Sequence, residues 1–300
     1  MSVVERALKR LQKGSSPQSV TKQKPVARVA NRRNAFHTPA NRTDDAQIEA
    51  HGRIIEFSVE AMAEAGLYSK GNSQLADEYR MIKQPVLRKA IEQNEAGNSR
   101  GNLVMVASAL GGEGKTFTSV NLSLSLASEK DWKVLLVDVD CRNPQLSRLL
   151  GVEKEPGIMD YLKDPELDIE SLIMPTSVDG LSVLPLGNVD EHAAEHLASA
   201  RMDELCEHFS SAGRNYIVVF DSSPLLLTAE SPILSTQIGQ VALVVMANAT
   251  PRQAVLEAIE KLDSDRAIGL ILNKADQGGD ILKYGHGYGY GYGYPGRTSG

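Results

Sequence analysis

The sequence has few cysteines and aromatic residues, and it lacks any long apolar segment. Two cysteines in 300 residues, Cys141 and Cys206, exclude a disulfide framework and indicate a reducing cytoplasm. The longest apolar run, residues 241–247, is far too short to span a bilayer. Residues 1–12 are charged throughout and lack the apolar core of a signal peptide. We therefore expect a cytoplasmic protein that something else must bring to a membrane.

The N-terminal region contains a long stretch without acidic residues. Residues 6–42 contain ten Lys or Arg and no Asp or Glu, although the whole chain carries a net charge of −6. The remainder is therefore clearly acidic, which argues against nucleic acid as a general partner. The basic arm alone could contact an anionic surface.

Composition divides the chain into four parts. Apolar residues at helical spacing in residues 2–11 predict a short basic amphipathic helix, and residues 14–45 have the composition of a disordered linker. Residues 46–67 are weakly amphipathic, and residues 74–94 predict a helix interrupted at Pro85. The boundaries that we expect are 1–45 for the arm, 46–100 for a helical segment with an oligomerisation motif, 101–278 for a P-loop domain and 279–300 for a Tyr/Gly-rich tail.

Short apolar runs alternate with helical patterns after residue 102. Continuous Val, Ile and Leu runs indicate strands that are buried on both faces, and the alternation predicts a parallel sheet with helices on both faces. The fold class is thus α/β. The expected strands are residues 103–106, 134–137, 181–184, 217–220, 241–246 and 268–272, and the clearest helices between them are 193–209 and 251–262.

A phosphate-binding P-loop follows the first of these strands. Residues 107–116 read Ala-Ser-Ala-Leu-Gly-Gly-Glu-Gly-Lys-Thr, with an amphipathic stretch at 117–127. Glycines let backbone N–H groups surround phosphate oxygens, and the following helix adds its positive end. Lys115 would reach the outer phosphates and Thr116 would bind Mg²⁺. The expected nucleotide-binding residues are Gly111, Gly112, Glu113, Gly114, Lys115, Thr116, Phe117 and Asn273.

Carboxylates follow two further strands. Asp138 and Asp140 lie at the end of one apolar run, and Asp221 ends another in the manner of a Walker B strand. The carboxyl ends of parallel strands meet where ligands bind. Carboxylates there suit Mg²⁺ binding and activation of an incoming hydroxyl, so we expect Asp140 and Asp221 to bind the metal with Thr116.

The last strand ends at residues 273–276, Asn-Lys-Ala-Asp. This matches the short Asn-Lys-x-Asp pattern with which GTPases read guanine, although related ATPases place Asn there against adenine. The sequence alone therefore leaves ATP and GTP open.

Together these motifs resemble the bacterial tyrosine kinases, the P-loop kinases of polysaccharide-export systems. The resemblance rests on Gly111 to Thr116, the Asp138-x-Asp140-x-Arg142 motif, Asp221 and the C-terminal tyrosines, and the basic N-terminal helix is similar to an exosortase-associated branch. Leu110 stands where partition and cell-division ATPases carry a signature Lys. Two departures are Lys83 in place of Arg in the ring-forming helix motif that begins at Asp77, and Ser222-Ser223-Pro224 where two prolines usually follow.

The resemblance implies ATP as donor, Mg²⁺ as cofactor and a protein tyrosine as acceptor. Lys115, Asp138, Asp140, Arg142 and Asp221 would be catalytic, with Asp138 orienting or deprotonating the tyrosine. The implied acceptors are Tyr284, Tyr288, Tyr290, Tyr292 and Tyr294.

The resemblance also implies partners and a location. They are a separate membrane-embedded chain-length-determining activator, other copies of the chain and a tyrosine phosphatase, with the kinase held at the inner face of the plasma membrane. The alternatives are a non-kinase P-loop ATPase or GTPase switch and a regulatory subunit that binds nucleotide without catalysis.

Overall fold

The structure is a computed structural model that describes residues 53–57, 73–95, 100–213, 215–262 and 266–275. The predicted N-terminal helix and linker lie outside these ranges, as do Asp276 and the five tail tyrosines. Among the residues that are described, no helix is both long and apolar enough to cross a bilayer.

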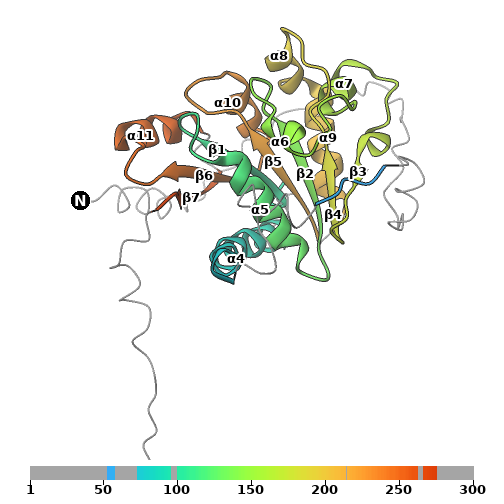
Figure 1. The fold of residues 1–300 in the computed structure, drawn as a ribbon. Helices are drawn as coiled ribbons and strands as arrows, with labels where there is room; N and C mark the ends of the chain where they lie inside the picture. The colour runs from blue at the N-terminus through green and yellow to red at the C-terminus, as the bar shows by residue number, and fades with distance from the viewer. Residues whose placement is uncertain (1–52, 58–72, 96–99, 214, 263–265, 276–300) are drawn as a thin grey trace, which may run out of the picture. The chain divides into compact units, whose positions relative to one another are not determined.

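A seven-stranded sheet forms the centre of the described part, and its strand order is β3-β4-β2-β5-β1-β6-β7 (Figure 1). All neighbours are parallel except β3 and β4. The predicted α/β fold is confirmed, and each predicted strand is present with small extensions. The strands are β1 (Leu103–Ser108), β2 (Lys133–Val139), β3 (Met174–Pro175), β4 (Leu181–Leu184), β5 (Tyr216–Ser222), β6 (Gln240–Met246) and β7 (Ala267–Asn273).

Helices cover both faces of the sheet. One apolar cluster packs α4, α5 and α6 against one face, and a second packs the helices from α7 to α11 against the other. The bounds are α4 (Ser73–Glu95), α5 (Lys115–Ala127), α6 (Gln145–Leu149), α7 (Ile158–Lys163), α8 (Ala193–Leu197), α9 (Ala200–Ser211), α10 (Glu230–Ser235) and α11 (Arg252–Glu260), with a short 3-10 helix at Ile169–Leu172.

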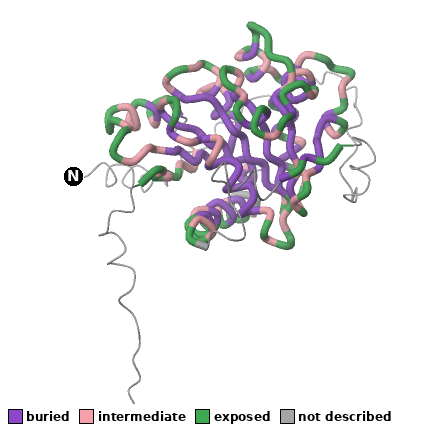
Figure 2. Tube along the Cα trace, in the orientation of Figure 1, coloured by how far each residue is buried: buried purple, intermediate pink, exposed green. Residues whose placement is uncertain are grey.

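The central strands are buried on both faces, but β7 is not (Figure 2). Leu270 is 58% exposed and Leu272 is 63% exposed. The expectation that every apolar run is doubly buried is therefore wrong for residues 268–272. This strand stands at the end of the sheet order, and among the described residues it pairs with β6 alone.

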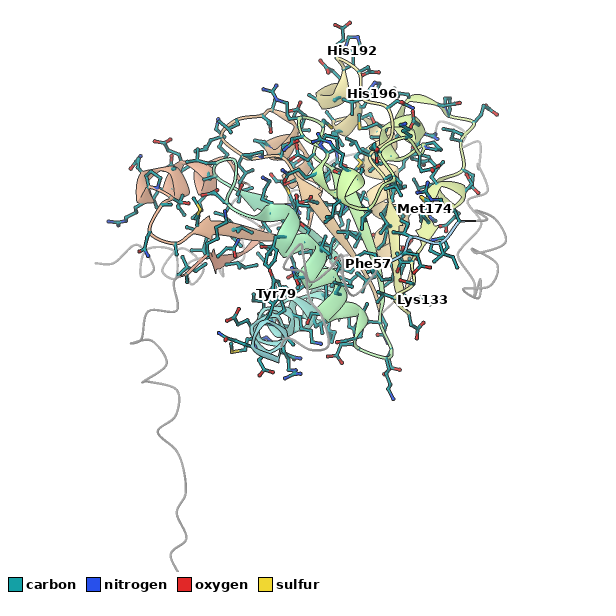
Figure 3. All side chains as sticks on the ribbon, viewed as in Figure 1. Phe57, Tyr79, Lys133, Met174, His192 and His196 are labelled. Carbon is teal, nitrogen blue, oxygen red and sulfur yellow. The ribbon has the colours of Figure 1, made fainter. Side chains whose placement is uncertain are left out.

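Helix α4 runs through Pro85 without interruption, contrary to the sequence-based expectation. Proline removes one intrahelical hydrogen bond, but Pro85 faces solvent. The opposite side of α4 buries Tyr79, Val86 and Leu87 in the cluster that it shares with α5. Burial of this face outweighs the lost bond, because helix stability in proteins comes mainly from packing. Tyr79 projects from α4 toward α5, where its ring meets Phe117 edge-on (Figure 3).

An extended segment, Arg53–Phe57, lies along the edge of β3 and departs from the helical pattern predicted for residues 46–67. Ile55 forms a parallel bridge with Thr176, donates to Pro175 O at 2.9 Å and accepts from Ser177 N at 2.9 Å. Ile55 and Phe57 are 3% and 7% exposed. Residues upstream of the predicted P-loop domain therefore contribute to its core.

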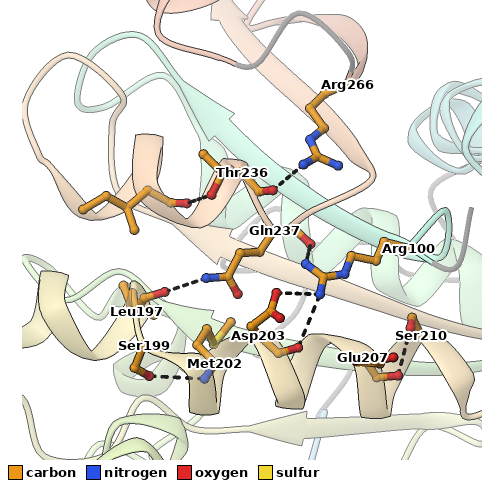
Figure 4. Close-up of polar contacts among 11 residues, drawn as sticks. Arg100, Leu197, Ser199, Met202, Asp203, Glu207, Ser210, Thr236, Gln237 and Arg266 are labelled. Atoms are coloured by element: carbon orange, nitrogen blue, oxygen red, sulfur yellow. Dashed lines mark hydrogen bonds and ion pairs between the residues drawn. The ribbon is translucent and has the colours of Figure 1, made fainter. Parts of the chain in front are cut away.

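The helix predicted over 193–209 is divided into α8 and α9 at Ser199, which accepts a hydrogen bond from Met202 N as an N-cap residue. Arg100 then connects α9 to the start of β1 (Figure 4). Its guanidinium donates to Asp203 Oδ1 at 2.6 Å and to Gln237 O at 3.2 Å. These contacts lie at the amino ends of β1 and β6, opposite the edge that carries the P-loop.

Candidate nucleotide and phosphoryl-transfer site

The predicted P-loop joins β1 to α5. Gly112 and Gly114 have φ values of 78° and 97°, which side chains rarely tolerate. Lys115 is the first residue of α5 and is 7% exposed. Glycine is also required at 114 by space, since a Cβ there would lie 2.1 Å from Asn273 Nδ2. The turn therefore places backbone N–H groups and a lysine at the positive end of a helix, as phosphate binding requires.

Glu113 stabilises this loop from inside. Its side chain is buried, Oε2 accepts from Leu110 N at 2.7 Å, and Oε1 accepts from the Thr250 hydroxyl. Thr250 stands just before α11, so the P-loop is connected to the β6–α11 side of the sheet. The acidic side chain is thus directed away from the phosphate side and into the protein.

Asp221 is the last residue but one of β5 and lies next to the first turns of α5. Ser119 Oγ donates to Asp221 Oδ1 at 2.9 Å, and the Thr116 hydroxyl lies close enough to the same carboxyl group to influence its pKa. Burial, followed by the charge of Asp138, raises the pKa of Asp221 to about 7, while the Thr116 and Ser119 hydroxyls and Lys115 oppose this shift. Asp221 Oδ2 is buried and accepts no hydrogen bond from the described residues.

Asp138 is fully buried on β2, and both of its carboxylate oxygens accept hydrogen bonds. Oδ1 accepts from Asp140 N at 3.1 Å, whereas Oδ2 accepts from Ser147 N at 2.8 Å and Ser147 Oγ at 2.6 Å. Burial raises the pKa of Asp138 to about 6 despite these three bonds. The carboxylate is therefore held in one orientation, and it is a stronger base than an ordinary aspartate.

Asp140 follows β2 and contacts the segment that follows β5. Its Oδ1 accepts from Arg142 N at 3.2 Å, Asn143 N at 3.1 Å and Ser223 Oγ at 2.7 Å. The Arg142 side chain is exposed beside it. Ser223 thus supplies a hydroxyl donor to this carboxylate from the segment that follows β5.

Residues Asn273 and Lys274 reach the P-loop from the end of β7. Asn273 Nδ2 donates to Glu113 O at 2.9 Å, and Lys274 Nζ donates to Gly112 O at 2.9 Å. Asn273 was predicted to bind the nucleotide, and the structure places its amide against the loop backbone. Phe117, predicted from the same motif, packs its ring against Tyr79 in the apolar cluster shared by α4 and α5.

These residues fit a nucleotide with Mg²⁺. The loop provides a cradle of N–H groups, and its backbone requires glycine at 114, where a Cβ would collide with Asn273. The unpaired oxygen of Asp221 and the hydroxyl of Thr116 lie together, and both are the hard oxygen donors that Mg²⁺ prefers. The neighbouring strand ends bring Asp138 and Asp221 into direct register, so all the predicted carboxylates lie at one edge of the sheet.

The charged residues of the motif from Asp77 to Lys83 differ in their exposure to solvent. Asp77 and Arg80 form an exposed ion pair. Lys83 is 4% exposed and contacts the end of α5, where its ammonium donates to Ser125 O at 2.8 Å and lies 2.8 Å from Glu129 Oε1. A cation at a helix C-terminus is favourable. Lys83 thereby joins α4 to the helix that begins at the P-loop lysine.

Sequence reasoning did not single out three hydrogen-bonding residues at this edge, and it noted Lys274 only as part of the Asn-Lys-x-Asp pattern. Ser119 is one turn beyond Lys115, Ser147 is nine residues beyond Asp138, and Thr250 follows the end of β6. The helical period could have predicted the position of Ser119, because a residue four positions after Lys115 lies on the same face of the helix. The contact of Ser147 depends on the path of the β2–α6 connection, which no local pattern predicts.

Comparisons with known proteins identify the family to which the chain belongs. The family described as "AAA domain" matches residues 101–262. The tyrosine-protein kinase CpsD of Streptococcus agalactiae is 31% identical over 206 residues, which are 65% of this chain and 87% of CpsD. EpsB of Ralstonia solanacearum is 31% identical over 204 residues, or 67% of this chain, and the chain spans only 26% of EpsB. The crystal structure of the VpsO kinase domain has 30% identity and a TM-score of 0.54, and the match covers 66% of this chain and 100% of that domain. The chain belongs to the AAA-domain P-loop proteins and, among them, to the bacterial tyrosine-protein kinase family.

Proposed function

We propose that the chain is an ATP-dependent protein-tyrosine autokinase that phosphorylates its own C-terminal tyrosines. One observation carries the proposal. The P-loop, Asp138, Asp140 and Asp221 converge at one edge of the sheet, and β7 ends at that same edge 11 residues before Tyr284. The family relationship supports the same reaction, because CpsD is named a tyrosine-protein kinase.

Phosphoryl transfer depends mainly on positioning and on charge neutralisation, and the site offers both. Lys115 and the loop N–H groups would stabilise charge on the β- and γ-phosphates. Thr116, Asp140 and Asp221 would hold Mg²⁺, which when bound supplies further neutralisation. Asp138 would orient the tyrosine hydroxyl and accept its proton, and exposed Arg142 would contact phosphate or the incoming tail.

The tail is long enough to reach an active site. For a Gly-rich chain, the roughly 17 residues from Asn273 to Tyr290 have an r.m.s. span of about 20–25 Å. This reach allows transfer within one molecule or to a neighbour, and we propose transfer in trans within a homo-oligomer. Each phosphate adds about −1.5 to −2 charges, so five would add roughly −8 to −10. Repulsion between phosphorylated tails would then dissociate the oligomer.

We infer a role in exopolysaccharide or capsule production, because one relative is named from a cps region of Klebsiella pneumoniae. The corresponding partners are a membrane-embedded chain-length determinant that activates the kinase and a phosphatase that resets it. The basic residues 6–42 would hold the kinase near anionic lipid at the inner face of the plasma membrane.

The test is incubation of the purified chain with Mg²⁺ and γ-labelled ATP or GTP, alongside Lys115→Met. We expect phosphotyrosine on the tail from ATP, and none in the variant, since the transferred phosphoryl group loses its main cation. Release of free phosphate without phosphotyrosine would indicate a P-loop switch. Binding without either product would indicate a regulatory subunit. Equal labelling of Lys115→Met would contradict the assigned site.

A further inference from the structure

Two consecutive residues bind two consecutive carbonyl groups of the P-loop. Lys274 donates from Nζ to Gly112 O, and Asn273 donates from Nδ2 to Glu113 O, both at 2.9 Å. Neither contact involves an N–H group of the turn. The pair therefore acts on the loop from the side opposite to its phosphate-binding groups.

The geometry of the peptide unit gives these contacts a consequence. In a trans peptide the C=O of one residue and the N–H of the next point in opposite directions. Holding the carbonyls of Gly112 and Glu113 toward β7 therefore directs the N–H groups of Glu113 and Gly114 away from β7. These are two of the groups with which a P-loop surrounds phosphate.

The backbone at this position supports a specific role. Lys274 has a φ of 54°, a left-handed conformation that few residues other than glycine adopt. Strained residues persist where their surroundings fix them, and they gather at functional sites. Gly114 completes the arrangement, because any side chain there would collide with Asn273 Nδ2.

We propose that Asn273 and Lys274 form a carbonyl clamp that orients the P-loop N–H groups toward the phosphates of the nucleotide. The proposal rests on the nucleotide site of the proposed function and assigns both residues to the phosphate half of the ligand. They are positioning residues, and the clamp contributes equally for any base. This differs from the base-reading role that the Asn-Lys-x-Asp pattern has in GTPases.

The test uses a ligand without a base. Binding of ATP, GTP and inorganic tripolyphosphate, each with Mg²⁺, is measured by calorimetry for the parent, Lys274→Met and Asn273→Ala. We expect Kd to rise for all three ligands in each variant: about tenfold for Lys274→Met, which loses a charge-assisted hydrogen bond, and severalfold for Asn273→Ala, which loses a neutral one. Lys274→Arg should restore much of the affinity. Lys261→Met, which changes an exposed lysine after α11, is the matched charge control and should bind like the parent.

Each outcome decides the proposal. Weaker ATP or GTP binding with unchanged tripolyphosphate binding would assign the pair to the base and overturn the clamp. Variants that bind all three ligands like the parent would overturn it as well. A parent that binds none of them would contradict the proposed function, and the clamp with it. Lys274 is exposed, so Lys274→Met should retain the parent's thermal unfolding and report on binding alone.

Discussion

Asp138 on β2 and Asp221 on β5 are register partners on neighbouring parallel strands. Both carboxyl groups are fully buried. Burial and the charge of Asp138 raise the pKa of Asp221, and burial raises that of Asp138. Two like charges on neighbouring strands repel one another when both carboxyl groups are ionised. A bound cation would relieve the repulsion.

This pair predicts a pH-dependent stability. The pKa of Asp221 is about 7 in the folded chain, whereas an unfolded aspartate titrates near about 3.9. The folded state therefore binds more protons between about pH 4 and 7, and its contribution to the free energy of unfolding falls as pH rises through that window. We expect Tm to fall from pH 5 to 7.5 without nucleotide, and to fall less in Asp221→Asn. An equally steep fall in this variant would show that Asp221 does not titrate in this range.

The substitution Asp138→Asn tests the proposed base. Asn has nearly the same shape but cannot accept the tyrosine proton, so initial rates of phosphotyrosine formation should drop about 100-fold or more. Nucleotide affinity should change little. Ser147→Ala is the matched control, because it keeps the carboxylate and removes one of its three hydrogen bonds. It should retain more activity than Asp138→Asn. A parental rate in Asp138→Asn would leave the carboxylate with a structural role only.

Alanine variants of Ser222 and Ser223 distinguish an effect on the position of Asp140 from an effect on local stability. Ser223→Ala removes the 2.7 Å bond to Asp140 Oδ1, whereas Ser222→Ala removes a 2.9 Å bond to Val106 O. We expect Ser223→Ala to need severalfold more Mg²⁺ for half-maximal nucleotide binding, because the Asp140 carboxylate loses one of the hydrogen bonds that position it. Ser222→Ala should lower Tm and leave the Mg²⁺ requirement unchanged. The same Mg²⁺ requirement in both variants would remove Ser223 from the metal site.

The sequence was most informative where a physical rule acts locally. Continuous apolar runs predicted β1, β2, β5 and β6 to within a few residues, because buried parallel strands need apolar side chains on both faces. Carboxylates at strand ends were predicted to gather at one edge, and they do so because parallel strands all end there.

The remaining features depend on contacts between distant residues. The pairing of Ile55 with Thr176 joins positions more than 100 residues apart through a single bridge, and a two-residue strand such as β3 has no periodicity. Pro85 is tolerated because it lies on the solvent side of a helix that is held by packing. Lys83 is buried because the end of α5 packs against it, and the sequence of α4 alone does not predict that contact.

The extended segment Arg53–Phe57 predicts where the folded unit begins. Removing residues 1–45 should leave Tm unchanged, because the polar arm has too few apolar residues to contribute to the core. Phe57→Ala should lower stability by about 3 kcal/mol, the lower end of the range for buried aromatics. Chemical denaturation of both variants measures the difference. A truncated protein that loses its cooperative transition would contradict this boundary.

The last prediction concerns the direction of transfer. A Lys115→Met protein with an intact tail is mixed with an active protein whose five tail tyrosines are Phe. If transfer occurs between molecules, label from ATP should appear on the Lys115→Met tail, since only that protein offers acceptors and only the other can transfer. Mass spectrometry of the tail identifies which tyrosines are labelled.

The structure also indicates a variant that tests the need for assembly. Asp77 and Arg80 are the exposed members of the helix motif, whereas Lys83 is buried within its own chain. The charge reversal Arg80→Glu should weaken association and slow labelling of the tail in the mixture, and it should leave nucleotide binding intact. Lys83→Met should instead lower Tm, because it leaves Glu129 and the end of α5 without their cation.

A mixture that stays unlabelled, while the wild type labels itself at a rate independent of concentration, would mean that each molecule phosphorylates its own tail. Phosphorylation would then require no neighbour, and the exposed charges of α4 would have no part in the reaction.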